Sequence, residues 1–167
     1  VVHDLRDPQV LYASMWDRAA EAGQRADSSS GIFKSTDGGS SWRRLENGLS
    51  QRGKFIGRMA IAVAPSNPDV LYVLADEGDV DGFYHSNDAG DTWTRLSDKL
   101  KARWDWCELC VSPNNEAEVY SIGQNSFVTK NSGETWTKIA GDIVHLRSHG
   151  SSVLHLDTHA MWINPNN

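Results

Sequence analysis

The sequence has few cysteines, no long apolar run and no excess of positive charge, and each of these shortages excludes a class of protein. Two cysteines in 167 residues are too few for a small domain held together by disulfides. No apolar run approaches the roughly 18 residues that a membrane-spanning helix requires. The formal net charge of -6 argues against a nucleic-acid partner, whose phosphates attract basic surfaces. With 39% hydrophobic residues, the composition is that of a folded protein.

The two cysteines, Cys107 and Cys110, form a CxxC pair outside the usual setting of a redox site. Redox CxxC pairs lie at helix N-termini, where the thiolate is stabilised, whereas WCELCVSP is typical of a strand. Side chains three residues apart on a strand point to opposite faces of the sheet. We therefore expect two half-buried thiols, and neither a disulfide nor a shared metal site.

One polar octet that ends in tryptophan occurs three times. It reads STDGGSSW over residues 35–42, SNDAGDTW over 86–93 and, with changes, TKNSGETW over 129–136. The flanking segments repeat with it, since GIFK, GFYH and NSFV precede the three octets. Repetition at about 40–50 residues predicts an array of similar structural units.

Each unit is expected to form four short antiparallel strands. In the second unit these are MAIAVAP, VLYVLA, GFYHS and TWTRLS, which are rich in β-formers and separated by Gly, Asn, Asp and Pro. The sequence therefore predicts an all-β fold of β-propeller blades. The expected blades cover residues 1–50, 51–100 and 101–145, and residues 159–167 form the first strand of a further blade. We thus expect about three blades of a larger propeller.

The octet is expected to be a structural turn between strands three and four. Its glycine can take positive φ, its Asp or Asn can accept a backbone amide two residues on, and its tryptophan can pack between blades. A turn that builds the fold is needed once per blade, whereas a catalytic acid is needed once per protein. The residues with this expected role are Ser35, Asp37, Gly39 and Trp42, then Ser86, Asp88, Gly90 and Trp93, then Thr129, Asn131, Gly133 and Trp136.

The pattern S/T-x-D/N-x-G-x-S/T-W resembles the Asp-box, also called the bacterial neuraminidase repeat. Together with SNPDVLYVLADE and HAMWINPNN, it is most similar to the sortilin-like and glycosyl-hydrolase-like propellers of bacteria and archaea. This resemblance implies a propeller that acts outside the cell or in the periplasm, although VVHDLRDP contains no visible leader peptide. It does not imply one activity, because Asp-boxes occur in enzymes and in receptors alike.

The strand order predicts which end of the blades carries function. The turns between strands one and two and between strands three and four share one end, the turn end. The other connections share the opposite end, the loop end, and long irregular loops on a rigid frame commonly bind ligands. The loop-end segments are 14–30, 46–57, 75–81, 97–105 and 140–158.

Aromatic and charged side chains in these segments suggest a binding site. Aromatic rings stack on the C–H faces of sugars, while charged groups bond the hydroxyls. The candidate ligand-binding residues are Trp16, Arg18, Arg103, Trp104, Trp106 and Arg147. We expect a glycan or a peptide as the ligand.

The segment HLDTH contains a candidate metal site. If it is extended, His155, Asp157 and His159 point to one face, and two imidazoles with a carboxylate suit zinc or a similar metal. The competing interpretation is that His159 begins a strand and only packs there. The acidic segment DEGDVD lacks the full spacing of a calcium loop, so we expect a surface loop. Apart from the metal ion, no cofactor is expected.

Two further functions remain open beside recognition. A propeller glycoside hydrolase would need two carboxyl groups across the scissile bond. The candidates are Asp79, Asp81, Asp105 and Asp157, and the sequence does not select a pair. A sialidase is disfavoured because its nucleophilic tyrosine has no counterpart outside the expected strands. The third alternative is a scaffold without a ligand, and in every case we expect further blades of a parent chain or self-association to cover the end blades.

Overall fold

The computed structural model describes residues 1–16, 30–49, 58–75, 81–97, 100, 107–123, 125–140 and 160–166. Every regular element in these ranges is a β-strand. The strands form three four-stranded sheets, and each sheet contains four strands that are consecutive in the chain and antiparallel. The expected all-β class is confirmed.

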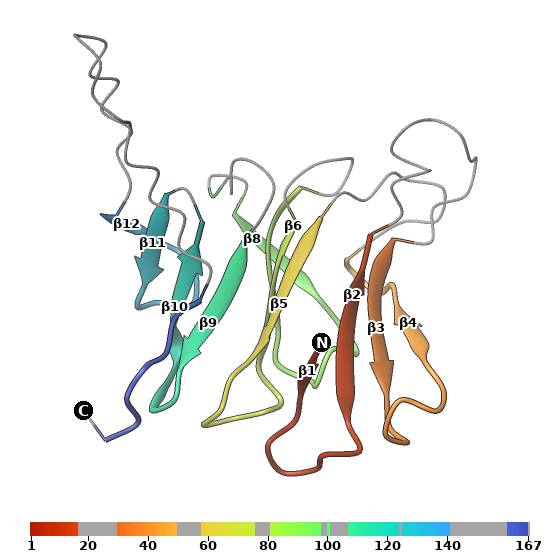
Figure 1. Ribbon diagram of the computed structural model, residues 1–167. Coiled ribbons are helices and arrows are strands. Elements are labelled where there is room, and N and C mark those ends of the chain that lie inside the picture. Colours follow the sequence, from red (N-terminus) through yellow and green to blue (C-terminus); the bar gives the residue numbers. More distant parts are fainter. Residues whose placement is uncertain are drawn as a thin grey trace, which may run out of the picture.

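The three sheets contain the following strands (Figure 1). The first consists of β1 (Val2–His3), β2 (Leu11–Met15), β3 (Gly31–Ser35) and β4 (Arg43–Leu45). The second consists of β5 (Met59–Val63), β6 (Leu71–Ala75), β7 (Gly82–Ser86) and β8 (Thr94–Ser97). The third consists of β9 (Glu108–Ser112), β10 (Asn115–Ile122), β11 (Ser126–Thr129) and β12 (Thr137–Ala140).

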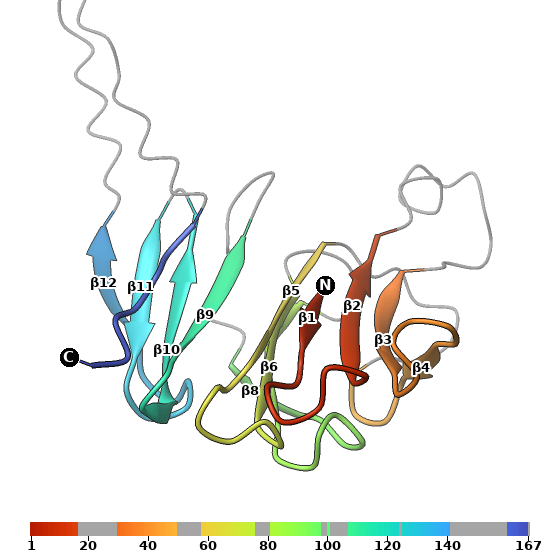
Figure 2. The ribbon, with the colours of Figure 1, turned by 60° about the horizontal axis from the view of Figure 1, so that its bottom comes forward.

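The sheets stand side by side, with the second between the first and the third (Figures 1 and 2). Their innermost strands are neighbours, because β5 contacts both β1 and β9. Residues 160–166 continue this series on the far side of β9, where the Cys110 thiol lies 3.9 Å from the Met161 carbonyl and the Asn114 amide donates to the Pro165 carbonyl at 2.7 Å. The arrangement is that of consecutive blades of a β-propeller.

The two cysteines follow the expectation from the sequence. Neither cysteine is in a disulfide, and both side chains are half-buried. Cys107 packs against the core between the second and third sheets, whereas the Cys110 thiol approaches residues 160–166 on the other side of the third sheet. The pair therefore does not form a disulfide.

Each interface between sheets has its own hydrophobic core, and β6 supplies both. Leu71 and Val73 face the first sheet, while Tyr72 and Leu74 face the third. All five residues of β6 are buried, which explains why VLYVLA is a continuous apolar run rather than an alternating one. The middle sheet is thus covered on both faces, as a blade inside an array must be.

Three aromatic rings join the second and third sheets. Tyr72 stacks on Phe83 with ring centroids 5.4 Å apart, and Trp136 meets Phe83 edge-on at 5.0 Å. Such aromatic pairs contribute about 0.5–1.5 kcal/mol each beyond the area that they bury. Trp136, the tryptophan that ends the third octet, therefore packs against the preceding blade.

The first two octets form the same hydrogen-bonded turn. In the first, the Ser35 hydroxyl accepts the amide of Gly39 at 2.9 Å, and the Asp37 carboxylate accepts the amide of Ser41 at 2.8 Å and its hydroxyl at 2.6 Å. Ser86, Asp88 and Thr92 repeat these contacts in the second octet. The Ser41 contacts, followed by the Ser35 hydroxyl, lower the pKa of Asp37 to about 2.

The third octet keeps the same turn with Asn131 in place of the aspartate. Its side-chain oxygen accepts the Thr135 amide at 3.0 Å, and its NH₂ group donates to the Thr135 hydroxyl at 2.9 Å. In the first two octets the hydroxyl is the donor in the corresponding bond. The direction of one hydrogen bond is reversed, and the turn survives.

Two expectations for the octets need correction. The Asp or Asn side chain accepts the amide four residues on, not two, because the amide two residues on is already bonded to the leading Ser or Thr. Trp93 is buried against the first sheet at 5% exposure, but Trp42 is 40% exposed. In the described part of the chain, no sheet precedes the one that carries Trp42.

The turn end is confirmed as one structural layer. The octet turns of the first and second sheets donate a backbone amide to the strand one-to-two turn of their own sheet, Gly38 to Gln9 at 3.0 Å and Ala89 to Asp69 at 2.8 Å. In the third sheet Ser132 donates to Ala117, near the start of β10, at 2.9 Å. All other connections between consecutive strands begin at the opposite end. The turns of this layer lie at the bottom of the sheets in Figure 2.

Candidate functional site

The sequence analysis assigned its candidate binding, catalytic and metal-ligating residues to the loop end, and two of them lie in described residues. These two are Trp16 and Asp81. The other candidates lie outside the described residues: Arg18, Asp79, Arg103, Trp104, Asp105, Trp106, Arg147, His155, Asp157 and His159. The described part of the candidate site is therefore the rim between the first and second sheets.

Trp16 and Arg58 form a pair at this rim. Trp16 directly follows β2 and Arg58 directly precedes β5, so the loop-end edges of two neighbouring sheets position them. The Arg58 guanidinium carbon lies 4.3 Å from the centroid of the Trp16 ring, which is a cation–π contact. The Trp16 indole N–H is shielded and has no acceptor among the described residues. Sequence reasoning selected Trp16 for binding but did not pair it with Arg58, because no motif links the two positions.

Asp81 is held within its own sheet. Arg95 donates to the Asp81 carboxylate at 3.1 Å and, through Nε, to the Asp81 carbonyl at 2.9 Å. Asp81 precedes β7 and Arg95 lies on β8, so this pair fixes the loop-end edge of one blade. The contacts give Asp81 a structural role, and none of the other proposed carboxylates lies within the described ranges.

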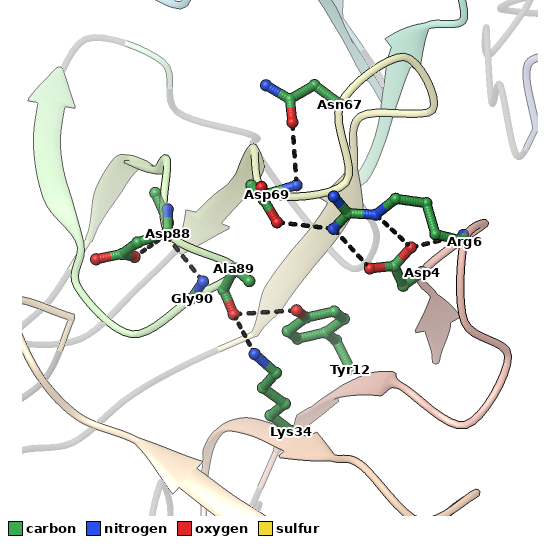
Figure 3. A network of polar contacts seen from close by, with 10 residues as sticks. Asp4, Arg6, Tyr12, Lys34, Asn67, Asp69, Asp88, Ala89 and Gly90 are labelled. Carbon is green, nitrogen blue, oxygen red and sulfur yellow. Dashed lines mark hydrogen bonds and ion pairs between the residues drawn. The ribbon is translucent and has the colours of Figure 1, made fainter.

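A second polar cluster joins the first and second sheets at the turn end (Figure 3). Arg6 donates to the buried carboxylate of Asp4 at 2.9 Å and to the exposed carboxylate of Asp69 at 2.7 Å. The hydrogen bonds from Arg6 lower the pKa of both carboxyl groups below the ordinary value of 3.8. One arginine thus links the strand one-to-two turns of two neighbouring blades.

The octet turn of the second sheet takes part in the same joint. The Ala89 carbonyl accepts hydrogen bonds from the Tyr12 hydroxyl at 3.0 Å and from the Lys34 ammonium at 2.8 Å (Figure 3). Ala89 has a φ of 55°, and this left-handed conformation aims its carbonyl at the first sheet. Burial raises the pKa of Tyr12 to about 12, so Tyr12 remains a donor across the neutral range.

The joint between the second and third sheets also uses the strand-two tyrosine, but its acceptor lies on β10 instead of in an octet turn. The Tyr72 hydroxyl donates to the Glu116 carbonyl at 2.9 Å, as Tyr12 donates to Ala89. His85 occupies the position of Lys34, since both pair directly with the tyrosine of strand two. The His85 ring lies 5.1 Å from the Tyr72 ring. Burial lowers the pKa of His85, and the carboxylate of Glu116 opposes this shift.

Acidification from pH 7.5 to pH 5 is expected to weaken this second joint. Because the pKa of folded His85 is depressed, the unfolded chain binds the proton first as the pH falls through about 6.5. Stability is therefore complete above the unfolded pKa and is lost as the pH falls toward the folded one. Urea unfolding at both pH values should show a smaller loss in His85→Gln than in the wild type. The matched control is His3→Gln, and a loss that His85→Gln leaves unchanged contradicts the assignment.

The described ranges contain neither a metal-binding cluster nor a membrane-spanning helix. No group of three or more His, Cys, Asp and Glu side chains is placed there to hold a metal ion. No helix among the same residues is long and apolar enough to cross a membrane. The proposed metal ligands His155, Asp157 and His159 lie outside these residues, so their arrangement stays a prediction.

No protein-family model matches the chain, and a comparison with curated proteins finds no match. Solved structures do match. The crystal structure of an ancestral GH74 enzyme aligns with a TM-score of 0.59 and 19% identity, over 83% of this chain and 19% of the enzyme. YCF48 from Cyanidioschyzon merolae aligns with a TM-score of 0.50 and 18% identity, over 82% of this chain and 35% of YCF48.

These likenesses concern the fold. Both neighbours are β-propellers, and at below 20% identity they support the propeller arrangement and no particular activity. The chain spans only 19% and 35% of their lengths. It therefore corresponds to a few blades of each neighbour.

Proposed function

We propose that this chain is part of an Asp-box β-propeller that recognises a glycan or a peptide at its loop end. The Asp-boxes have a structural role in this proposal. It assigns the blades to residues 1–50, 51–100 and 101–145, with the first strand of a further blade at 159–167. It also places the protein in the sortilin-like and sialidase-like superfamily, outside the cell or in the periplasm.

The observation that carries the proposal is the contrast between the two ends of the blades. At the turn end, each octet turn bonds to the strand one-to-two turn or to the start of strand two in its own sheet, and Arg6, Tyr12 and Lys34 bridge the first two sheets. At the loop end, Trp16 and Arg58 form a cation–π pair at the rim of two blades, and the buried indole N–H of Trp16 has no acceptor among the described residues. An aromatic ring beside a cation suits a sugar or a peptide with an acceptor group.

Binding to a glycan array and to a peptide library tests the proposal. We expect one of the two collections to contain a ligand, and Trp16→Ala to weaken its binding at least tenfold, which corresponds to about 1.4 kcal/mol. Trp42→Ala is the matched control, because Trp42 belongs to the same sheet but lies at its turn end. An equal loss in the two variants, or no ligand in either collection, contradicts the proposal.

Hydrolysis is the competing outcome of the same experiment. The chain is incubated with a panel of chromogenic glycosides, and any turnover is measured again in Asp105→Ala and Asp157→Ala. Turnover that either substitution abolishes would replace the recognition module by a glycoside hydrolase with a carboxylate pair. The contacts of Asp81 with Arg95 do not favour that alternative.

A further inference from the structure

The pair Asn47–Gly48 has a chemistry that neither the octets nor the loop-end candidates use. It lies in the turn that follows β4, in which the Leu49 amide donates to the Glu46 carbonyl at 3.4 Å. Both residues of the pair are exposed. In the described ranges the Asn47 side chain has no hydrogen-bond partner, so its amide group is free to turn toward the main chain.

The Gly48 amide nitrogen is open to attack chemistry. The Asn47–Gly48 peptide bond is trans, so its carbonyl and its N–H point in opposite directions. The Asn47 carbonyl accepts the Trp93 amide of the second sheet at 2.9 Å. The Gly48 N–H therefore points away from the second sheet, and it donates to none of the described residues. Glycine also has no side chain that could shield this nitrogen.

We propose that Asn47 is a site of spontaneous deamidation and isomerisation, with water as the co-reactant. The Gly48 nitrogen loses its proton and attacks Cγ of Asn47, so that an N–Cγ bond forms, the Cγ–Nδ2 bond breaks and ammonia leaves with that proton. Water then opens the resulting succinimide ring. Cleavage of the new N–Cγ bond gives aspartate, whereas cleavage of the original peptide bond gives isoaspartate, whose main chain passes through Cβ and Cγ.

The isoaspartate form cannot keep the native contacts of this turn with the second sheet. Its main chain contains an additional carbon atom, so Gly48 has to move. Gly48 packs so closely on the second sheet that a Cβ there would collide with the Trp93 carbonyl. Leu49, the next residue, is 3% exposed in the core between the first and second sheets. Isomerisation therefore loosens this joint, whereas aspartate leaves the main chain unchanged.

Asn131 provides an internal control, because its side chain and the next amide are both held. Its side-chain oxygen accepts the Thr135 amide at 3.0 Å, and its NH₂ group donates to the Thr135 hydroxyl at 2.9 Å. The Ser132 amide donates to the Ala117 carbonyl at 2.9 Å. Since these bonds must break before the ring can close, conversion at Asn131 should be at least about tenfold slower than at Asn47.

Incubation of the 167-residue chain under mildly alkaline conditions, followed by tryptic digestion, tests the site. The tryptic segment LENGLSQR, residues 45–52, contains Asn47 as its only asparagine. Mass spectrometry should show replacement of its amide by an acid, and an isoaspartate-specific methyltransferase should label it. The rate should rise with pH, because the Gly48 nitrogen attacks in its deprotonated form. The proposal fails if this segment converts no faster than NSGETWTK, residues 131–138.

Thermal unfolding of the aged protein tests the effect on the joint. Isomerised protein should have a Tm about 2–4 °C below that of fresh protein, the shift that corresponds to loss of one hydrogen bond. Asn47→Gln keeps the main-chain carbonyl that binds Trp93, but its side chain is too long for a succinimide, so its Tm should not change with age. Fresh Asn47→Asp should match fresh wild type within about 2 °C. Equal losses in aged wild type and aged Asn47→Gln would refute the effect on the joint.

Discussion

Replacing Gly133 by alanine is expected to destabilise the protein by about 2–5 kcal/mol, the sum of two separate costs. Gly133 has a φ of 99°, and a left-handed residue with a Cβ costs about 1–2 kcal/mol. A Cβ at this position would lie 2.6 Å from Cδ1 of Phe83 and closer still to Cε1. Phe83 is 0% exposed and is held between Tyr72 and Trp136. The ring cannot move aside without breaking the aromatic contacts between the second and third sheets.

Gly39→Ala is the matched control for this substitution. Gly39 has the same place in its octet and a φ of 92°, but its nearest neighbour, Leu11 Cδ1, would lie 3.4 Å from the added Cβ. We expect only the backbone cost of about 1–2 kcal/mol. Denaturant unfolding of both variants separates the two contributions. Equal losses would show that Phe83 yields, which would contradict a rigid aromatic joint.

Replacing Tyr72 by alanine is expected to cost about 3–5 kcal/mol, the usual range for removal of a buried large aromatic side chain. Tyr72 is 0% exposed, stacks on Phe83 and donates to the Glu116 carbonyl. The substitution removes the ring from the second joint and leaves a buried acceptor without its donor. Since domains of this size are stable by about 5–15 kcal/mol in total, the variant should lose a large fraction of its stability and unfold at a clearly lower urea concentration.

Two comparisons divide this loss into its parts. Tyr72→Phe keeps the ring and removes the hydroxyl, so the unpaired Glu116 carbonyl should cost about 1–3 kcal/mol. Tyr120→Ala makes the same truncation at the same register of the third sheet, where the side chain is only half-buried. Thermal and urea unfolding should rank Tyr72→Ala well below both. If Tyr120→Ala is as damaging as Tyr72→Ala, packing between sheets does not set the cost.

The strand positions could be read from the sequence because local chemistry determines them. The short β-branched and aromatic runs became strands, and the turn between β7 and β8 falls where Gly90 supplies a positive φ. Even the altered third octet was recognisable, since Asn131 reproduces the backbone contacts of Asp37. The three copies together predicted a turn that is repeated in every unit, which a single octet would not have done.

The contacts between sheets could not be read in the same way. Arg6 meets Asp69 and Arg58 meets Trp16 across distances along the chain that no local pattern encodes. The left-handed conformation of Ala89 was also missed, because alanine gives no signal for a conformation that usually requires glycine. The loop-end candidates beyond Trp16 and Asp81 lie outside the described residues, so they remain predictions from residue type and position.

The hydroxyls of Tyr12 and Tyr72 donate to acceptors that lie further along the chain, and this direction has a consequence for biosynthesis. Tyr12 finds its acceptor at residue 89, and Tyr72 finds its acceptor at residue 116. When a nascent chain has left the ribosome only as far as β4, Ala89 is absent and the Tyr12 hydroxyl lacks its native acceptor. The first sheet therefore completes its contacts only after the second sheet has been translated. The packing between sheets therefore forms one blade behind synthesis, because each repeat of such a protein contacts only its neighbours.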